Sequence, residues 1–200
     1  MLKQLTLTLI IFSSPLMAAD ESICSSPPNE KNIPATTPTA QFDFTETGNF
    51  VTDKKTGLMW TRCPLGYQWN TVNNSCAVSS NGGKMSWLSA LEFVRDNKAA
   101  ASDNAYLGFS DWRLPNIKEL ASIIERRCAS RAINAQIFGL DAVGAYWSNT
   151  HSASSPDLIW VVVFGESVDI LAGTIAGRVT AVDATEEFFV RLVRDTNVTP

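Results

Sequence analysis

The chain has 200 residues, 45% of them hydrophobic, and carries a formal net charge of −4 at neutral pH. This length predicts a single domain that is large enough to bury a substantial core. The acidic balance disfavours nucleic acid as a partner, because phosphate backbones attract proteins that present a stripe of positive charge.

The first nineteen residues have the pattern of a secretory signal peptide. Lys3 gives a positive n-region, residues 5–12 form a short apolar h-region, and residues 15–19 make a small-residue cleavage zone. Cleavage is predicted after Ala18 or Ala19, which removes one lysine and changes the net charge from −4 to −5. The apolar run is too short to span a bilayer, and no later run reaches that length. The sequence therefore predicts an exported protein, periplasmic, surface-located or secreted, with no membrane span after cleavage.

The next segment, residues 20–40, is rich in Pro, Ser, Thr and Asn and predicts an extended N-terminal arm. Residues 41–196 form the predicted domain. It begins with a hairpin, because Phe42 and Phe44 alternate with polar residues before a turn, and the apolar pattern resumes at Phe50. A second turn at residues 53–57 leads into a strand over residues 58–62.

The four cysteines allow three disulfide pairings in an oxidising compartment. Cys63 and Cys76 flank a loop with few apolar residues, so we pair them, and closing that loop stabilises the fold by about 3 kcal/mol. Cys24 then pairs with Cys128 and ties the arm to the end of the second helix. No metal site is predicted, because no Cys-x-x-Cys spacing occurs and the chain has one histidine.

Two loops carry candidate ligand contacts, residues 63–84 and 150–157. Tyr67 and Trp69 in the first are large aromatic side chains that either contact a sugar or protein or cover the nearby disulfide as a small satellite core. His151 and Asp157 are the candidates in the second loop, which is long and polar. No catalytic residue is predicted, because the cysteines that could pair with His151 are assigned to disulfides.

Two helices are predicted in the middle of the chain. The first begins after Ser86 and ends near Asn97, and the second begins after Asn116, where Glu119 completes a capping box. Each has one apolar stripe: Trp87, Ala90, Leu91 and Val94 in the first, and Ile117, Leu120, Ala121, Ile124 and Cys128 in the second. A basic cluster (Arg126, Arg127 and Arg131) follows the second stripe. It either complements the helix C-terminus or forms an anion-binding patch.

β-branched and aromatic residues dominate the chain beyond Gly144, as a half-buried antiparallel sheet prefers. The predicted strands are residues 145–149, 158–164, 168–171 and 188–194, the last with strict alternation. Together these elements predict an α+β domain in which two helices pack on a twisted, mainly antiparallel sheet. Trp60, Trp112, Trp147 and Trp160 are assigned to its core.

Acidic residues do not gather into a recognisable site. Glu186 and Glu187 are adjacent, so they point to opposite faces of a strand. Asp111 and Arg113 flank Trp112, which predicts structural ion pairs. Calcium is conceivable as a ligand of loop carboxylates, but no Asp-x-Asp-x-Asp pattern supports it, and no cofactor is predicted.

Five segments resemble one family when taken together: residues 53–60 (DKKTGLMW), 111–115 (DWRLP) with Glu119 and Leu120, 146–148 (YWS), 160–164 (WVVVF) and 190–194 (VRLVR). The resemblance is to the Lcl C-terminal domain family, named after a bacterial collagen-like surface adhesin, and it spans residues 42–195. It implies a C-type-lectin-like fold, distantly related to formylglycine-generating enzymes. In the namesake it implies binding of sulfated glycans and a trimeric assembly.

This chain departs from the family pattern in several ways, and these differences limit which properties of the family can be expected of it. It has no collagen-like Gly-x-y repeat, and its acidic charge weakens the expectation of sulfated-glycan binding. The calcium-binding signatures of C-type lectins are absent, Ser155-Pro156-Asp157 being a partial match. The paired active-site cysteines of formylglycine-generating enzymes have no assignable counterpart. The resemblance therefore carries the fold rather than the ligand.

The sequence favours a ligand-binding module that recognises a surface or extracellular glycan or protein through loops, an adhesion-type role. One alternative is a formylglycine-generating-enzyme-like or hydrolytic enzyme, which would need a reactive thiol. Another is a structural component of an envelope or surface assembly, which would bind a protein partner but no glycan.

Overall fold

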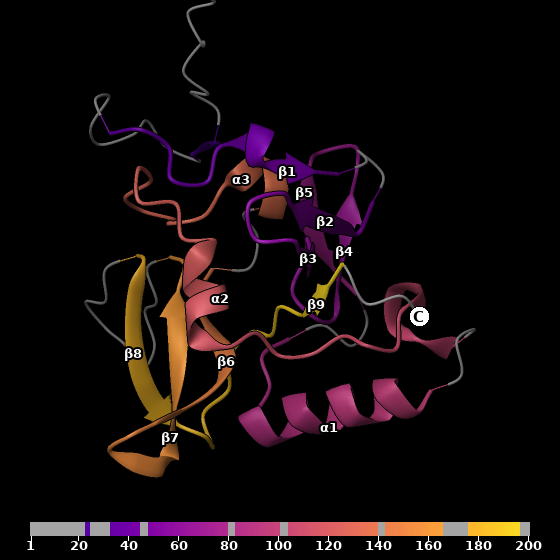
Figure 1. Cartoon of the computed structure of the whole chain (residues 1–200), viewed down its shortest axis with the longest axis vertical. Coiled ribbons are helices and arrows are strands. Elements are labelled where there is room, and N and C mark those ends of the chain that lie inside the picture. The colour runs from indigo at the N-terminus through magenta and orange to yellow at the C-terminus, as the bar shows by residue number, and fades with distance from the viewer. Residues whose placement is uncertain are drawn as a thin grey trace, which may run out of the picture.

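The computed structural model describes residues 23–24, 33–44, 48–79, 83–100, 104–139, 143–165 and 176–196. The predicted signal peptide, most of the predicted arm and the predicted strand over residues 168–171 lie outside these described residues. Figure 1 shows the N-terminal strands in one half of the molecule, and the sheet β6–β8 with helix α1 in the other. The domain is α+β, as predicted, and its sheets are antiparallel.

The N-terminal strands form one sheet with the end of the chain. Its strands are β1 (Phe42–Asp43), β2 (Phe50–Asp53), β3 (Leu58–Thr61) and β9 (Val193–Asp195), in the order β1-β2-β3-β9. Both predicted turns are therefore confirmed as hairpin connections. The buried Asp53 carboxylate holds the second one by accepting hydrogen bonds from the Lys55 amide (2.9 Å) and the Thr56 hydroxyl (2.8 Å).

A second sheet contains the most apolar strands. It consists of β6 (Ala145–Ser152), β7 (Ser155–Val163) and β8 (Arg178–Asp183). Strand β6 runs three residues beyond its predicted end, through a register shift between Trp147 and His151. His151 therefore lies in a strand and not in a loop. Strand β8 was not predicted.

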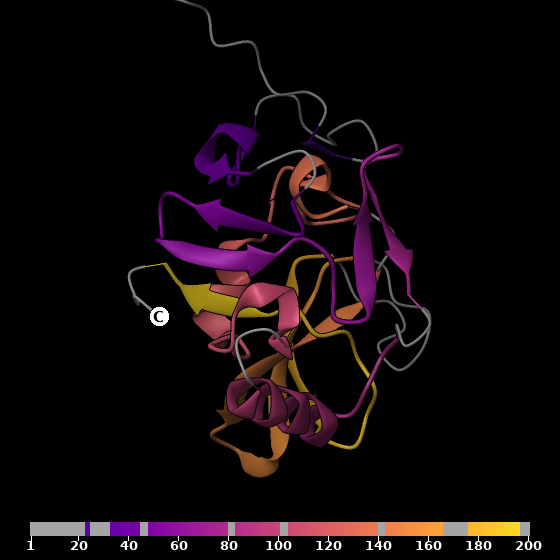
Figure 2. The same cartoon turned by 90° about the vertical axis from the view of Figure 1, so that its right-hand side faces the viewer.

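A third, two-stranded sheet lies where the sequence predicts only a loop. Its strands are β4 (Tyr67–Asn70) and β5 (Ser75–Val78). The prediction of a loop was wrong, because the hairpin is held by the Cys63–Cys76 disulfide and the Trp69–Cys76 cross-strand pair instead of an alternating apolar pattern. In Figure 2 this magenta hairpin lies at a steep angle to the strands of the N-terminal sheet. The yellow strand β9, from the C-terminal part of the chain, belongs to that sheet.

Both predicted helix starts are confirmed. Helix α1 (Trp87–Ala99) begins after Ser86, whose side chain accepts a hydrogen bond from the Ser89 amide. Helix α2 (Ile117–Ser122) has the predicted capping box of Asn116 and Glu119. Three short helical elements were not predicted. The 3-10 turn η2 (Thr39–Gln41) precedes β1, the 3-10 turn η4 (Tyr106–Gly108) lies between α1 and α2, and the short helix α3 (Ala135–Phe138) follows α2.

Helix α2 is shorter than its apolar stripe indicates. It ends at Ser122, so Ile124 and Cys128 lie beyond it, and its last turn contains no basic residue. The assignment of the basic cluster to a helix C-terminus was therefore wrong. The cause is Glu125. Its buried carboxylate accepts hydrogen bonds from the Thr37 amide (2.7 Å) and the Arg127 amide (2.9 Å), so the residues around Glu125 pack against the N-terminal arm instead of continuing the helix.

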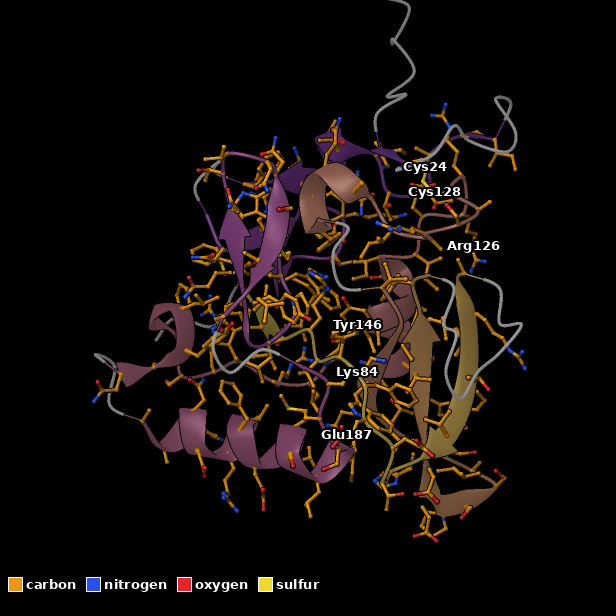
Figure 3. All side chains as sticks on the ribbon, turned by 180° about the vertical axis from the view of Figure 1, so that it is seen from behind. Cys24, Lys84, Arg126, Cys128, Tyr146 and Glu187 are labelled. Atoms are coloured by element: carbon orange, nitrogen blue, oxygen red, sulfur yellow. A yellow bond between two sulfur atoms is a disulfide. The ribbon has the colours of Figure 1, made fainter. Side chains whose placement is uncertain are left out.

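Both predicted disulfides are present, Cys24–Cys128 and Cys63–Cys76, with Cα–Cα distances of 5.4 and 5.5 Å. The first fixes the N-terminal arm at the edge of the molecule, where Figure 3 shows Cys24 beside Cys128. Ile23 next to it is fully buried. The arm is thus part of the fold at this point.

Two clusters of buried side chains make up the core. One contains Trp60 and the other contains Trp112 and Trp147, whereas Trp160 is only half-buried. The segment 188–194 runs between them. Its predicted alternation is confirmed, with Phe189 and Val193 in the first cluster and Phe188, Val190 and Leu192 in the second. The predicted strand was too long, because β9 begins only at Val193.

Candidate functional site

A cleft of about 100 Å³ opens between the β4–β5 hairpin and the turn η4. Its lining combines aromatic, amide and hydroxyl side chains: Asn49, Thr61, Cys63, Gly66, Tyr67, Gln68, Ser79, Tyr106 and Leu107. Ligand pockets for whole small molecules measure roughly 300–1,000 Å³. This cleft is therefore of a size to hold one chemical group of a larger ligand.

The hairpin wall of the cleft is fixed by hydrogen bonds at its base. Gly66 adopts a φ of 81°, which favours glycine, and its carbonyl oxygen accepts hydrogen bonds from the Ser79 amide (3.0 Å) and hydroxyl (2.6 Å). The Trp69 amide donates to the Asn49 side chain at 3.2 Å. The β4–β5 hairpin is thereby locked to the segment before β2.

The opposite wall is held by helix α1 and by Trp112. The buried Asn97 side chain accepts a hydrogen bond from the Tyr106 amide (2.6 Å) and donates one to the Phe109 carbonyl (3.0 Å). The Trp112 indole donates to the Tyr106 carbonyl at 2.8 Å. Leu107 has a φ of 52°, a left-handed conformation that costs a non-glycine residue about 1–3 kcal/mol and is concentrated at binding and catalytic sites.

None of the described side chains that line the cleft carries a charge at neutral pH. Burial raises the pKa of Tyr106, so its hydroxyl keeps its proton. The remaining polar groups of the lining are amides and hydroxyls, which both donate and accept hydrogen bonds. This chemistry suits a neutral, hydroxyl- or amide-bearing group rather than an ion.

Tyr67 and Trp69 are placed together at this site. Trp69 is 8% exposed, because the Arg62 guanidinium lies 3.4 Å from its ring centre and the Cys63–Cys76 disulfide packs beside it. Tyr67 contacts Phe189 edge-to-face at 6.0 Å and also lines the cleft. The two aromatic residues thus form the satellite core that was one of the two interpretations of this loop, and Tyr67 also borders the open space.

His151 and Asp157 lie elsewhere, on the hairpin between β6 and β7. Figure 1 shows this hairpin at the opposite end of the molecule from β4. The His151 ring packs against Trp87 at 4.9 Å, and its Nδ1 lies 2.8 Å from the Pro156 carbonyl oxygen. Asp157 is exposed. The structure therefore does not unite the four predicted contact residues in one site.

The ion pairs predicted around Trp112 are confirmed. Asp111 accepts a hydrogen bond from Arg194 at 2.7 Å, and Arg113 pairs with Glu119 at 2.8 Å and Asp195 at 3.3 Å. The hydrogen bond that Arg113 donates to Glu119 is the main cause of the raised pKa of Arg113. These charges join the start of α2 to β9 and do not face the cleft.

All four cysteines are oxidised, which leaves no thiol for the paired-cysteine chemistry that the enzyme alternative requires. Within the described ranges, no three His, Cys, Asp or Glu side chains gather as a metal site needs. In the same part of the chain, no helix combines the length and apolar character of a membrane span.

The described residues thus form an α+β fold with two disulfides and one small cleft beside the β4–β5 hairpin. Comparison with known protein families matches residues 49–194 to the Lcl C-terminal domain, a match that covers well over half of the chain. The chain belongs to this family. A comparison with curated proteins finds no match.

Proposed function

We propose that this protein is an exported binding module that recognises an extracellular or surface glycan, with one neutral sugar unit in the cleft between the β4–β5 hairpin and η4. The observation that carries the proposal is the lining itself. Tyr67 and Tyr106 supply aromatic surface, and Asn49, Gln68 and Ser79 supply amide and hydroxyl groups. Sugars present the same combination of apolar C–H faces and hydroxyl groups.

Two further features support this proposal. Disulfides persist in oxidising compartments, so the two disulfides fit a protein that works outside the cytoplasm. The strained wall residue Leu107 follows Tyr106, whose amide and carbonyl are held by Asn97 of α1 and by Trp112, and this pre-organises the cleft. His151 and Asp157 form a second, separate proposed contact on the β6–β7 hairpin.

A glycan array with and without calcium, followed by calorimetry on the best ligand, tests the proposal. Gln68→Ala and Tyr106→Phe each remove polar groups from the cleft, worth about 0.5–1.5 kcal/mol per hydrogen bond. We expect a Kd about threefold to tenfold weaker for each variant. The control is Asn73→Ala, an exposed residue of the β4–β5 turn outside the cleft lining, and its Kd should not change.

The outcomes separate the competing functions. Unaltered affinity in both cleft variants, with weaker binding in a His151→Ala, Asp157→Ala double variant, would move the site to the β6–β7 hairpin. A protein that binds no glycan but co-purifies with an envelope protein would replace glycan recognition by a structural role in an assembly. Unchanged melting temperatures of the variants would show that each effect is on binding.

A further inference from the structure

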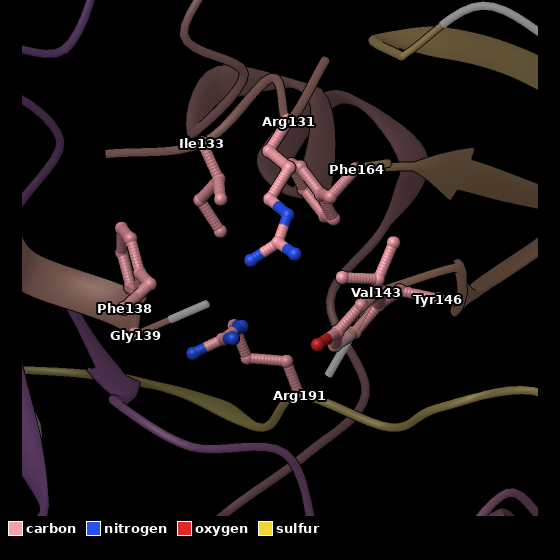
Figure 4. A pocket seen from close by; sticks show the side chains of 8 residues that line it. All are labelled: Arg131, Ile133, Phe138, Gly139, Val143, Tyr146, Phe164 and Arg191. Carbon is pink, nitrogen blue, oxygen red and sulfur yellow. The ribbon is translucent and has the colours of Figure 1, made fainter. Parts of the chain in front are cut away.

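The cleft beside the β4–β5 hairpin has room for one side group of a sugar. A void needs about 10–15 Å³ to hold one water molecule. The small cavity that Figure 4 shows between Arg131, Tyr146 and Arg191 measures about 10 Å³, so it has space for no more than about one water. The cleft measures about 100 Å³ and can accept a group of several non-hydrogen atoms.

The cleft combines apolar and polar surface. Its apolar part includes the half-buried side chain of Leu107, which packs against the second core cluster, and the rings of Tyr67 and Tyr106. Its polar part includes the side chains of Asn49 and Ser79. A group that uses both kinds of surface has an apolar end and a hydrogen-bonding end.

The orientation of the Asn49 amide is fixed by the backbone. Its Oδ1 accepts a hydrogen bond from the Trp69 amide at 3.2 Å, and a backbone N–H can only donate, so the two ends of the Asn49 amide cannot be exchanged. The other end is the NH2 group, which also only donates. Asn49 therefore contributes a hydrogen-bond donor, its Nδ2, to the lining of the cleft.

The Ser79 hydroxyl is set in the opposite sense. It donates its hydrogen to the Gly66 carbonyl oxygen at 2.6 Å, and a hydroxyl has one hydrogen and two acceptor lone pairs. The Ser79 Oγ therefore contributes a hydrogen-bond acceptor to the cleft. Together with Asn49, it gives the lining one donor and one acceptor whose roles are set by contacts within the protein.

A secondary amide carries the complementary pair of groups. Its carbonyl oxygen accepts a hydrogen bond where Asn49 donates, and its N–H donates where Ser79 accepts. The acetamido group of a 2-acetamido sugar joins a methyl group to this amide, and the methyl suits the apolar surface of Leu107. A sugar hydroxyl at the same position has no methyl group to bury.

We infer that the cleft binds the acetamido group of an N-acetylhexosamine, with its carbonyl at Asn49, its N–H at Ser79 and its methyl against Leu107. This inference rests on the glycan recognition proposed above and narrows it to one class of sugar unit. The acetamido group then selects the ligand, and the remainder of the glycan lies outside the cleft.

Matched pairs of sugars test the inference. Calorimetry compares the methyl glycosides of N-acetylglucosamine and N-acetylgalactosamine with those of glucose and galactose, which carry a hydroxyl in place of the acetamido group. Two hydrogen bonds and one buried methyl group contribute roughly twofold to tenfold each. We expect at least one acetamido sugar to bind about tenfold or more tightly than its hydroxyl counterpart.

The outcomes separate this inference from the proposed function. Equal Kd values within both pairs would overturn the acetamido assignment and leave glycan recognition in place. A glycan array on which no glycan binds would overturn glycan recognition itself, and the acetamido assignment with it.

A matched pair of variants locates the acetamido group. Asn49→Asp keeps an oxygen that accepts from the Trp69 amide but replaces the NH2 donor by a second acceptor. This variant should lose the preference for acetamido sugars. Asn73→Asp makes the same change of charge at an exposed position outside the cleft lining and should keep the preference. A preference that survives in Asn49→Asp would overturn the placement of the group in the cleft.

Saturation-transfer NMR on the unmodified protein gives a direct reading that does not depend on any variant. The acetyl methyl protons of the bound sugar should receive the strongest saturation, because the methyl lies against Leu107 and the tyrosine rings. Strong saturation of the sugar-ring protons with little at the methyl would overturn the inference, even if the acetamido sugar binds more tightly.

Discussion

Arg62 and Arg191 are buried, although removing a cation from water is costly. Backbone carbonyls meet much of that cost. Arg62 donates to the carbonyl oxygens of Ile137 (2.9 Å) and Gln136 (3.0 Å) at the end of α3. Aromatic faces supply more, because the Arg62 guanidinium lies over Trp69 and that of Arg191 lies 4.7 Å from the ring centre of Phe138. Replacing either arginine would leave buried carbonyl groups without donors.

Tyr106 and Tyr146 should titrate later than ordinary tyrosines, because burial raises the pKa of both above the usual 10.0. Each phenol therefore contributes stability that is fully present below pH 10.0 and is lost as the pH rises through the raised pKa. We expect tyrosinate absorbance to appear in a delayed phase. Tyr106→Phe and Tyr146→Phe should each remove part of that phase.

The protein unfolded in denaturant provides the control for this titration, since all three of its tyrosines should then ionise in the ordinary range. A single phase with its midpoint near pH 10 in the folded protein would contradict the prediction.

The start of α2 is fixed by its own residues. Asn116 accepts hydrogen bonds from the amides of Lys118 and Glu119, both at 2.9 Å, and the Glu119 carboxylate accepts one from the Asn116 amide at 2.7 Å. Asn116→Ala should lower the free energy of unfolding by about 1 kcal/mol in urea denaturation. The control is Lys118→Ala, a substitution at an exposed position two residues further along the chain, and it should have little effect on the free energy of unfolding. An equal loss in both variants would show that the cap is not the cause.

The sequence predicts elements well where the determinants are local. Both helix starts and the first two hairpins depend on caps and turns within a few residues. The end of α2 could not be predicted, because Glu125 is bound by Thr36 and Thr37, which are 89 and 88 positions away. The hairpin β4–β5 was missed for a similar reason, since its stability comes from a disulfide and from Arg62 over Trp69.

The candidate cleft was predictable only on one side. Tyr67 stands out in the sequence as an aromatic residue in a polar segment. The opposite wall depends on the left-handed conformation of Leu107 and on the hydrogen bonds of Asn97, and neither residue type indicates such a role. The buried arginine pair was also missed, because the alternation over residues 188–194 predicts a strand in which Arg191 would face solvent, whereas Arg191 lies before β9 and is buried.

Across the whole molecule, the two disulfides close loops of very different length. Their sequence separations are 104 residues for Cys24–Cys128 and 13 for Cys63–Cys76. The chain-entropy argument gives a contribution of about 4.7 kcal/mol for the first and about 3 kcal/mol for the second. In urea denaturation, Cys24→Ser, Cys128→Ser should therefore destabilise the protein more than Cys63→Ser, Cys76→Ser.

If the Cys63→Ser, Cys76→Ser variant were the less stable of the two, a contact other than the Cys24–Cys128 disulfide would hold the N-terminal arm. Thr36 and Thr37 bind the Glu125 carboxylate through both their amides and their hydroxyls, so this contact could hold the arm without the disulfide. Glu125→Gln in each disulfide variant separates the two contributions.

The segment 188–194 supplies one wall to each of the two core clusters, Phe189 and Val193 to one and Phe188, Val190 and Leu192 to the other. Neither cluster can close against water until this single segment is in place. The two halves of the molecule are therefore expected to complete their packing together rather than one after the other.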